Sequence, residues 1–434
     1  MLLTTSQNTY ILVFDGIIAT NSFVEELIIT DMKVRIAIML LILIAIFSID
    51  SISQTTNDDT FTNSAGKLLE SERKLSIGGY GQIDYNQPLG NGQDHSGKLD
   101  VHRLVLLFGY RFSNKLSFVT EIEFEHVKEV YVEQAFINYS FNNYLNFRAG
   151  LMLIPMGIIN EYHEPTTFHG VERPLIDKYI SPTTWRELGF GFTGSIPEIS
   201  VKYQLYLVNG FASYNDGDAL LSGSNGLRKG RQKGAKSFIN SPNMTSKIEY
   251  YGILGINLGL SGYFGKTQSS LYNGISKNDV TENMIADSSV IGTSMIGVDA
   301  RYRRKGFEIR GQFYYVSNSN TLEYNTFTAS DNTLNDFGKT MYGYYAEVSY
   351  DVFRLVDKFN SQLMPFVRYS NYDTQSSVAK DLTKNETFQK TVITTGLNWK
   401  IHHGVVLKSD FQFIKSKLDD HYNKTFNAGI ALWF

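Results

Sequence analysis

The sequence predicts an all-β fold: a transmembrane antiparallel β-barrel of about sixteen strands, with a long third loop folded into its lumen. Three observations lead to this prediction. Segments of about ten residues alternate apolar and polar side chains with a period of two. The connections between these segments alternate between short and long. The final segment is apolar on one face and ends on an aromatic residue.

The final segment, 425–434, defines how such a barrel would close. One face of the extended chain carries Phe426, Ala428, Ile430, Leu432 and Phe434. The opposite face is small or polar, apart from Trp433. We expect this strand to pair with the first one, near 77–85, and so to close the sheet. Taken alone, it would also fit the edge strand of a soluble sandwich.

The composition sets broad limits on the fold and the function. The chain has 434 residues, and a soluble chain of this length usually divides into about two or three domains, whereas a closed barrel is one sheet. It has no cysteine, which excludes a disulfide framework and a cysteine-based metal site or nucleophile. The net charge is −3, so no basic surplus points to nucleic acid as a partner.

The N-terminal part predicts a secretory signal peptide. Lys33 and Arg35 precede the apolar run 36–49, and the small residues Ser51 and Ser53 follow at the −3 and −1 positions of a cleavage site. The run is shorter than the ~20 residues that a membrane helix needs. Met32 opens this signal directly. We therefore interpret the chain as four parts: an upstream extension from a misplaced start (1–31), the signal peptide (32–53), a short periplasmic lead-in (54–74) and the barrel (75–434).

The alternating segments predict sixteen strands, an even number as bacterial barrels require. They are 75–85, 99–112, 115–126, 129–140, 144–153, 184–195, 199–210, 244–252, 255–265, 290–303, 306–317, 340–352, 362–373, 388–400, 404–414 and 425–434. Short turns such as 112–115 and 303–306 alternate with long connections such as 154–183 and 211–243. The third and fourth strands break this rule, since only a few residues near 126–128 join them. Outer-membrane barrels have short periplasmic turns and long external loops.

The third loop, 154–183, is the most distinctive segment. It is charged and holds four of the eight prolines, which stiffen a chain in extended or turn conformations. We expect it to fold into the lumen and narrow it, with a polar network of Glu172, Arg173, Asp177, Lys178, Arg186 and Glu187. A surface lid without a role in selectivity is the alternative.

The strand alternation also assigns charges to the lumen. The inward positions include Arg103, Arg148, Arg301, Arg303, Arg310, Arg368, Glu121 and Glu123. The two signs nearly balance over all inward positions. The acids gather on the third strand and the arginines on the tenth, eleventh and thirteenth, so we expect opposed walls and weak ion selectivity. A basic stretch in the fourth loop, 228–236, would attract anions or bind lipopolysaccharide phosphates, or is simply a solvated loop.

Other motifs give no site. The stretch 189–194 matches a dinucleotide fingerprint, but it lies within a predicted strand and no helix follows it. His163, Glu164 and His169 lie on a proline-bearing loop without the spacing of metal ligands. No nucleophile and base stand out. We therefore predict no catalytic residue, no metal and no cofactor.

Several motifs in and after the third loop carry a family resemblance. They are Gly170-Val-Glu-Arg-Pro174, Pro182-Thr-Thr-Trp-Arg-Glu187 and Gly189-Phe-Gly191, together with the opening Gly78-Gly-Tyr-Gly-Gln82 and the terminal Phe434. With these, the chain resembles the Bacteroidetes outer-membrane porins grouped with the phosphate-selective porins O and P. The resemblance covers essentially the whole mature chain. It implies a sixteen-stranded, trimeric diffusion channel, in whose phosphate-specific members lumenal arginine and lysine clusters bind the anion. This sequence shows no concentrated cluster of that kind.

Together these observations predict an outer-membrane porin for passive diffusion of small hydrophilic solutes or ions, with anions such as phosphate among them. The expected partners are membrane lipid, lipopolysaccharide, small anions or solutes, and two further copies in a homotrimer, with no nucleic acid. The outer-membrane assembly machinery would recognise the last strand through Phe426, Ile430, Leu432 and Phe434. The alternative is a non-conducting barrel that acts as an adhesin, a structural protein or a barrel enzyme.

Overall fold

The computed structural model describes residues 3–5, 9–14, 17–19, 62–90, 96–356 and 358–434. The chain forms two units, 1–54 and 55–434. In the first, β1 (Leu3–Thr5), β2 (Thr9–Phe14) and β3 (Ile17–Ala19) form an antiparallel sheet in that order. The predicted signal peptide, 32–53, lies outside the described residues. None of the helices in the described part is long and apolar enough to cross a membrane.

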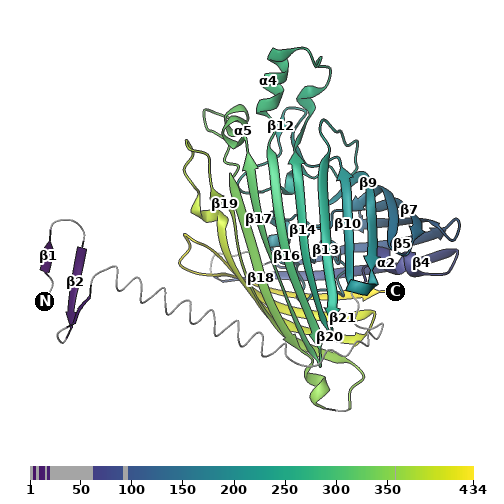
Figure 1. The fold of residues 1–434 in the computed structure, drawn as a ribbon. Helices are drawn as coiled ribbons and strands as arrows, with labels where there is room; N and C mark the ends of the chain where they lie inside the picture. The colour runs from purple at the N-terminus through teal and green to yellow at the C-terminus, as the bar shows by residue number, and fades with distance from the viewer. Residues whose placement is uncertain (1–2, 6–8, 15–16, 20–61, 91–95, 357) are drawn as a thin grey trace. The chain divides into compact units, whose positions relative to one another are not determined.

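The second unit is a closed antiparallel barrel of sixteen strands, which confirms the predicted fold class (Figure 1). Its strands are β4 (Leu75–Leu89), β5 (Lys98–Arg111), β6 (Leu116–Glu125), β7 (Glu129–Asn142), β8 (Leu145–Leu153), β9 (Arg186–Ile196), β10 (Val201–Val208), β13 (Asn243–Ile253), β14 (Ile256–Lys266), β16 (Gly292–Arg304), β17 (Phe307–Ser319), β18 (Thr340–Tyr350), β19 (Gln362–Ser377), β20 (Gln389–His402), β21 (Val405–Ser416) and β22 (Asn423–Trp433). β22 pairs with β4, as predicted, with Ala428 opposite Tyr85. Every predicted strand is present, and the boundaries agree to within a few residues.

The two faces of the barrel wall differ as the alternation predicts. Apolar side chains such as Leu104, Ile248 and Phe313 point outward and are exposed. Their inward neighbours along the strands, such as Arg103 and Lys247, are buried. An apolar outer wall around a polar interior is the arrangement that a barrel needs in contact with lipid chains.

The long connections gather at one end of the barrel. The third connection contains α3 (Ile176–Tyr179), and the later ones contain α4 (Val280–Ser288) and α5 (Thr321–Phe327). β12 (Asp218–Ala219), β11 (Ala212–Asn215) and β15 (Gln268–Ser269) form a small sheet between two of these connections. Single 3₁₀ turns lie in three of the long connections, at Arg228–Gly230, Ser270–Tyr272 and Glu386–Phe388. Two more, Pro197–Ile199 and Val352–Leu355, lie in connections at the opposite end of the barrel. Figure 1 shows α4 and α5 beyond the strand ends.

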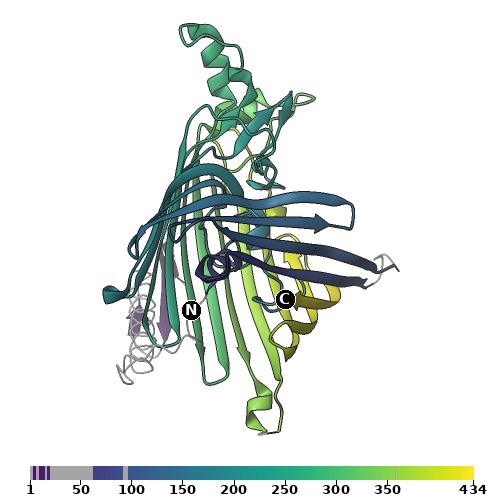
Figure 2. The same cartoon turned by 90° about the vertical axis from the view of Figure 1, so that its right-hand side faces the viewer.

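A short helix, α2 (Ser64–Glu70), lies against the inner wall of the barrel (Figure 2). The side chain of Asn63 caps it by accepting a hydrogen bond from the Gly66 N–H. Ala65 joins the buried cluster that contains Val119, and Leu68 packs beside Gly109. The sequence predicts only a short lead-in at 54–74, without a helix. The helix escapes the sequence pattern because it is two turns long, too short for a helical period to show.

Candidate functional site

The third loop, 154–185 (loop 3 below), crosses the lumen, which confirms the expected fold of this loop. Inward-facing lysines hold its backbone from distant strands. Lys408 Nζ on β21 donates to the carbonyl oxygens of Phe168 and Gly170 at 2.7 and 2.8 Å. Lys247 Nζ on β13 donates to the Gly157 carbonyl at 2.8 Å. A loop buried in this way keeps its shape because its polar backbone groups have partners.

Further contacts from the wall fix the tip of loop 3. Arg310 Nη1 donates to the Thr167 carbonyl at 2.8 Å, and Arg368 donates to the His169 carbonyl. The Val171 N–H donates to Asp410 Oδ2 at 2.7 Å. These contacts come from β17, β19 and β21, so several strands in one part of the wall bind the loop.

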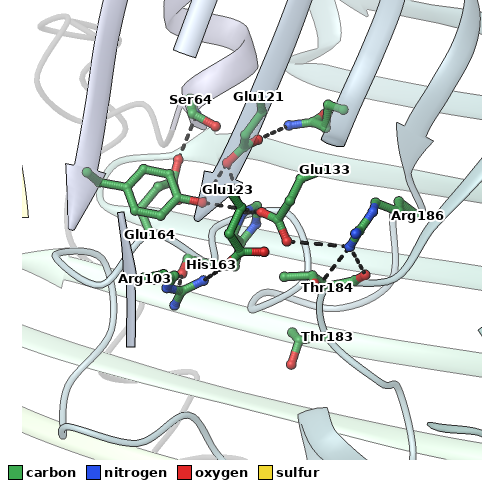
Figure 3. Close-up of polar contacts among 12 residues, drawn as sticks. Ser64, Arg103, Glu121, Glu123, Glu133, His163, Glu164, Thr183, Thr184 and Arg186 are labelled. Carbon is green, nitrogen blue, oxygen red and sulfur yellow. Dashed lines mark hydrogen bonds and ion pairs between the residues drawn. The ribbon is translucent and has the colours of Figure 1, made fainter. Parts of the chain in front are cut away.

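On the other side, loop 3 inserts His163 into a fully buried cluster of charges (Figure 3). His163 Nε2 lies 3.0 Å from Glu133 Oε2 and 3.3 Å from Glu121 Oε1. Arg186 Nη1 lies 3.5 Å from Glu133 Oε1, and the Tyr80 hydroxyl donates to Glu121 at 2.5 Å. Burial disfavours the charged imidazole, but the two carboxylates outweigh it and raise the pKa of His163 to about 10. His163 is therefore a cation at neutral pH, and it fastens loop 3 to β6 and β7.

Four of the predicted pore residues meet at this cluster. Arg103 Nη2 donates to the His163 carbonyl at 3.1 Å, and its Nη1 lies 4.0 Å from Glu123. Glu121 and Arg186 contact His163 and Glu133 as described above. Glu133 was not predicted as an inward residue. A register shift in the β6–β7 pairing lies opposite Glu121, and this bulge turns Glu133 inward against the strand alternation.

The arginines on the other wall have carboxylates beside them. Arg301 Nη2 lies 3.2 Å from Glu249, and Arg310 Nε lies 3.0 Å from Glu347. The remaining pairs join Arg303 and Arg310 to Glu308, and Arg368 to Glu347. The structure therefore does not separate the charges into opposed walls, because each of these arginines has a carboxylate on the same strand or on a strand one or two positions away.

Asp177, Lys178 and Glu187 lie apart from the His163 cluster. Asp177 is buried and accepts two hydrogen bonds from Gln312 Nε2, at 2.6 and 2.7 Å. Burial raises the pKa of Asp177 to about 7, although these hydrogen bonds act in the opposite direction. Lys178 is exposed. Glu187 on β9 accepts a hydrogen bond from the Trp185 indole N–H at 2.7 Å.

Two further predicted residues, Glu172 and Arg173, lie in the middle of loop 3. Glu172 Oε1 accepts a hydrogen bond from Asn86 at 3.1 Å. Arg173 Nη2 donates to the His163 carbonyl at 3.2 Å. Both therefore contact the half of the lumen that β4 and the His163 cluster occupy.

The histidines and the glutamate considered as metal ligands do not come together. His169 Nε2 lies 2.9 Å from the Ser349 hydroxyl, and its Nδ1 lies 2.5 Å from Asn398 Nδ2. Glu164 accepts a hydrogen bond from the Ser64 N–H of α2 at 2.7 Å. Each of these side chains serves to attach loop 3 to its surroundings.

A cavity of about 430 Å³ lies between α2, loop 3 and the wall. Its charged lining residues are Arg111, Lys115, Arg148, Lys202, Lys247, Glu70, Glu161 and Glu249. Two of the carboxylates have cationic partners, since Glu161 lies 2.6 Å from Lys247 and Glu249 lies 3.2 Å from Arg301. The sequence did not reveal this cavity as a unit, because α2 and loop 3 supply part of its lining.

Comparison with known proteins agrees with this architecture. The family described as phosphate-selective porin O and P matches residues 76–428. The chain belongs to this family. An uncharacterized protein of Aquifex aeolicus (strain VF5) is 34% identical to this porin over 383 residues, which cover 85% of this chain and 82% of that protein. Because that relative is from Aquifex, the likeness to Bacteroidetes members in particular stays a prediction.

Two solved structures share the fold of the porin. The outer membrane channel DcaP of Acinetobacter baumannii is 11% identical, with a TM-score of 0.52, over 83% of this chain and 97% of that one. The anion-selective porin from Comamonas acidovorans is also 11% identical, with a TM-score of 0.51, over 83% of this chain and 99% of that one. The family and the fold together identify the protein as a bacterial outer-membrane porin, which is a channel protein.

Proposed function

We propose that this porin passes small hydrophilic solutes by passive diffusion and prefers anions, phosphate among them. The basic lining of the 430 Å³ cavity carries the proposal. Arg148 Nε donates to Asn138 at 2.9 Å, and Lys202 Nζ lies 5.5 Å above the Tyr251 ring. Both of these partners are neutral. Lys202 also faces Glu249 across the β10–β13 pairing, so the Arg148 charge is the more available of the two to an anion in the cavity. The anion selectivity named for the Comamonas structure belongs to that protein and supports the same direction here.

We assign the constriction to loop 3 and the lumenal charges around it. This assignment covers the predicted residues Glu172, Arg173, Asp177, Lys178, Arg186, Glu187, Arg103, Arg148, Arg301, Arg303, Arg310, Arg368, Glu121 and Glu123. The many contacts between loop 3 and the wall support it, since a solute that crosses the barrel must pass beside this loop.

Reversal potentials across planar bilayers in a salt gradient test the ion preference. We expect the purified porin to select anions, and the double variant Arg148→Gln/Lys202→Gln to lose most of that selectivity. Lys305→Gln is the matched control, because Lys305 is exposed in the turn between β16 and β17. Cation selectivity of the unaltered porin would contradict the proposal. A folded barrel that does not conduct would favour the adhesin or enzyme alternative.

Two further partners are part of the proposal. The family resemblance supports a homotrimer. The basic stretch 228–236 lies in the loop between β10 and β13, at the long-loop end. Arg231 donates to the Thr183 carbonyl of loop 3 and Lys233 lies over the Tyr131 ring, so we assign contact with lipopolysaccharide phosphates to the exposed Lys229 and Lys236.

The terminal residue supports recognition by the outer-membrane assembly machinery. The Phe434 N–H donates to the Gly79 carbonyl and the Gly79 N–H donates to a Phe434 oxygen, each at 2.9 Å. The Phe434 side chain is nevertheless 63% exposed, so it adds little to a packed core. Its alternate apolar neighbours Phe426, Ile430 and Leu432 precede it on β22.

We expect deletion of Phe434 to lower the amount of folded porin in the outer membrane, while the porin that does fold keeps its reversal potential. Heat-modifiable migration on gels measures the folded fraction in cells. Phe434→Tyr is the control, because it keeps an aromatic end and should assemble normally. Normal folded yield of the deletion variant would contradict the role of the terminal aromatic.

A further inference from the structure

Three side chains with metal-ligating atoms meet at the long-loop end of the barrel. Asp100 and His102 lie near the start of β5, and His126 lies in the turn between β6 and β7. Asp100 Oδ2 is 2.5 Å from His126 Nδ1 and 3.8 Å from His102 Nδ1. One ligand atom from each residue lies within 4.8 Å of the other two. No part of the porin function described above uses this group.

The backbone at this point departs from regular β-structure, and the departure brings the three side chains together. The β4–β5 register shifts between Gln82 and Asp84, because Gln82 pairs with Arg103 while Asp84 pairs with Asp100. One extra residue in β5 therefore forms a bulge beside His102, and a bulge redirects a side chain.

The turn completes the arrangement. His126 has a φ of 52°, in the left-handed region that histidine visits more readily than most residues. The His126 N–H donates to the His102 carbonyl at 3.3 Å. This bond holds the two imidazole side chains beside each other, with ring centroids 5.5 Å apart.

We propose that Asp100, His102 and His126 bind a divalent transition-metal ion such as Zn²⁺. Two imidazole nitrogens and one carboxylate oxygen are a common ligand set for such ions, with bonds of about 2.0–2.2 Å. Water would supply the remaining ligands, since the side chains are 32%, 34% and 45% exposed for His102, Asp100 and His126.

A neighbouring carboxylate strengthens the proposal. Glu125 Oε1 lies 3.9 Å from His126 Nε2, the ring nitrogen that Asp100 does not contact. Metal-bound histidines commonly direct their second ring nitrogen at a carboxylate, which fixes the ring orientation. The guanidinium of the nearby Arg103 donates to Gln82 Oε1 and to the His163 carbonyl, although its charge still acts on His102.

The buried group of Glu121, Glu133 and His163 provides a contrast. Its ligand atoms are as close together, but all three side chains are fully buried. Arg186 already places a positive charge 3.5 Å from Glu133. That group is closed to solvent and already holds a cation, whereas the group at Asp100 is partly exposed.

Isothermal titration of ZnCl₂ into the folded, detergent-solubilised porin tests the proposal. We expect saturable binding of one Zn²⁺ per chain, weakened more than about tenfold in His126→Asn and in His102→Gln, since even the groups behind metal ligands change affinity by about 10–100-fold. Asparagine tolerates the left-handed conformation at position 126, so His126→Asn keeps the turn. Heat-modifiable migration confirms that each variant is folded.

The double variant His402→Asn/His403→Asn is the matched control. This pair also brings two imidazoles together, with ring centroids 5.7 Å apart, at the turn between β20 and β21. Among the residues that the structure describes, no carboxylate forms an ion pair with either of them. We expect this control to bind Zn²⁺ like the unaltered porin. Absence of saturable binding, unchanged binding in both test variants, or loss of binding in the control would each overturn the proposal.

Discussion

Deletion of residues 62–70, which removes α2, is expected to raise the single-channel conductance by a factor of roughly two, because a helix with its side chains is about 10–12 Å across. α2 lies against the inner wall and lines the 430 Å³ cavity through Asn63, Gly66, Leu69 and Glu70. Any ion that uses this cavity passes beside the helix. Conductance of the purified variant in planar bilayers gives the measurement.

Deletion of α4 (Val280–Ser288) is the matched control for this experiment. It removes a helix of similar length, and most of its residues are exposed beyond the strand ends (Figure 1). The conductance of the control should therefore stay close to that of the unaltered porin. An unchanged conductance after removal of α2, in a barrel that still migrates as folded, would mean that the ion path does not follow this cavity.

The strands and their closure could be predicted because they depend on local information. Alternating side chains and short turns repeat along the chain, and one wrong residue does not hide such a pattern. The position of loop 3 also follows from its length, its prolines and its charges. The two ion pairs of Glu347 follow from register, since Arg310 and Arg368 both stand directly opposite Glu347. The prediction of opposed walls is wrong because it does not take this register into account.

Single-residue irregularities could not be predicted, and they shape the two most unusual groups. The bulge in β7 turns Glu133 inward to meet His163, and the bulge in β5 brings His102 beside Asp100. A bulge changes the facing of a side chain by one position, while the hydrophobic pattern around it stays almost the same. The contacts of loop 3 also join residues that are far apart in the sequence, such as Lys408 and Gly170, and a local pattern does not reveal such pairs.

Replacement of Glu133 by glutamine is expected to lower the free energy of unfolding by about 3 kcal/mol or more, because removal of one partner from a buried ion pair leaves the other charge uncompensated. Here the charges left behind belong to His163, 3.0 Å away, and to Arg186, 3.5 Å away. Glutamine keeps the shape of the side chain, so the change tests charge rather than packing. Denaturant unfolding of the detergent-folded porin gives the measurement.

Lys417→Gln is the matched control for Glu133→Gln. It also removes one charge from an ion pair, with Glu386 at 3.1 Å, but the lysine side chain is 55% exposed. Water and salt weaken such surface pairs, so this variant should change the unfolding free energy far less. Equal effects of Glu133→Gln and Lys417→Gln would contradict a structural role of the buried cluster.

The pH dependence of the same cluster provides an independent measurement through His163. Its pKa is raised from an ordinary 6.5 to about 10 in the folded porin. A raised pKa means that the folded state binds the proton more tightly, so the stabilisation is complete below pH 6.5 and is lost as the pH rises through about 10. The stability advantage of the unaltered porin over His163→Gln should therefore be constant in acid and shrink across that interval. An advantage that grows with pH would show that the imidazole is neutral in the cluster, and loop 3 would then be held by its backbone contacts with Lys408, Lys247 and Arg310 instead.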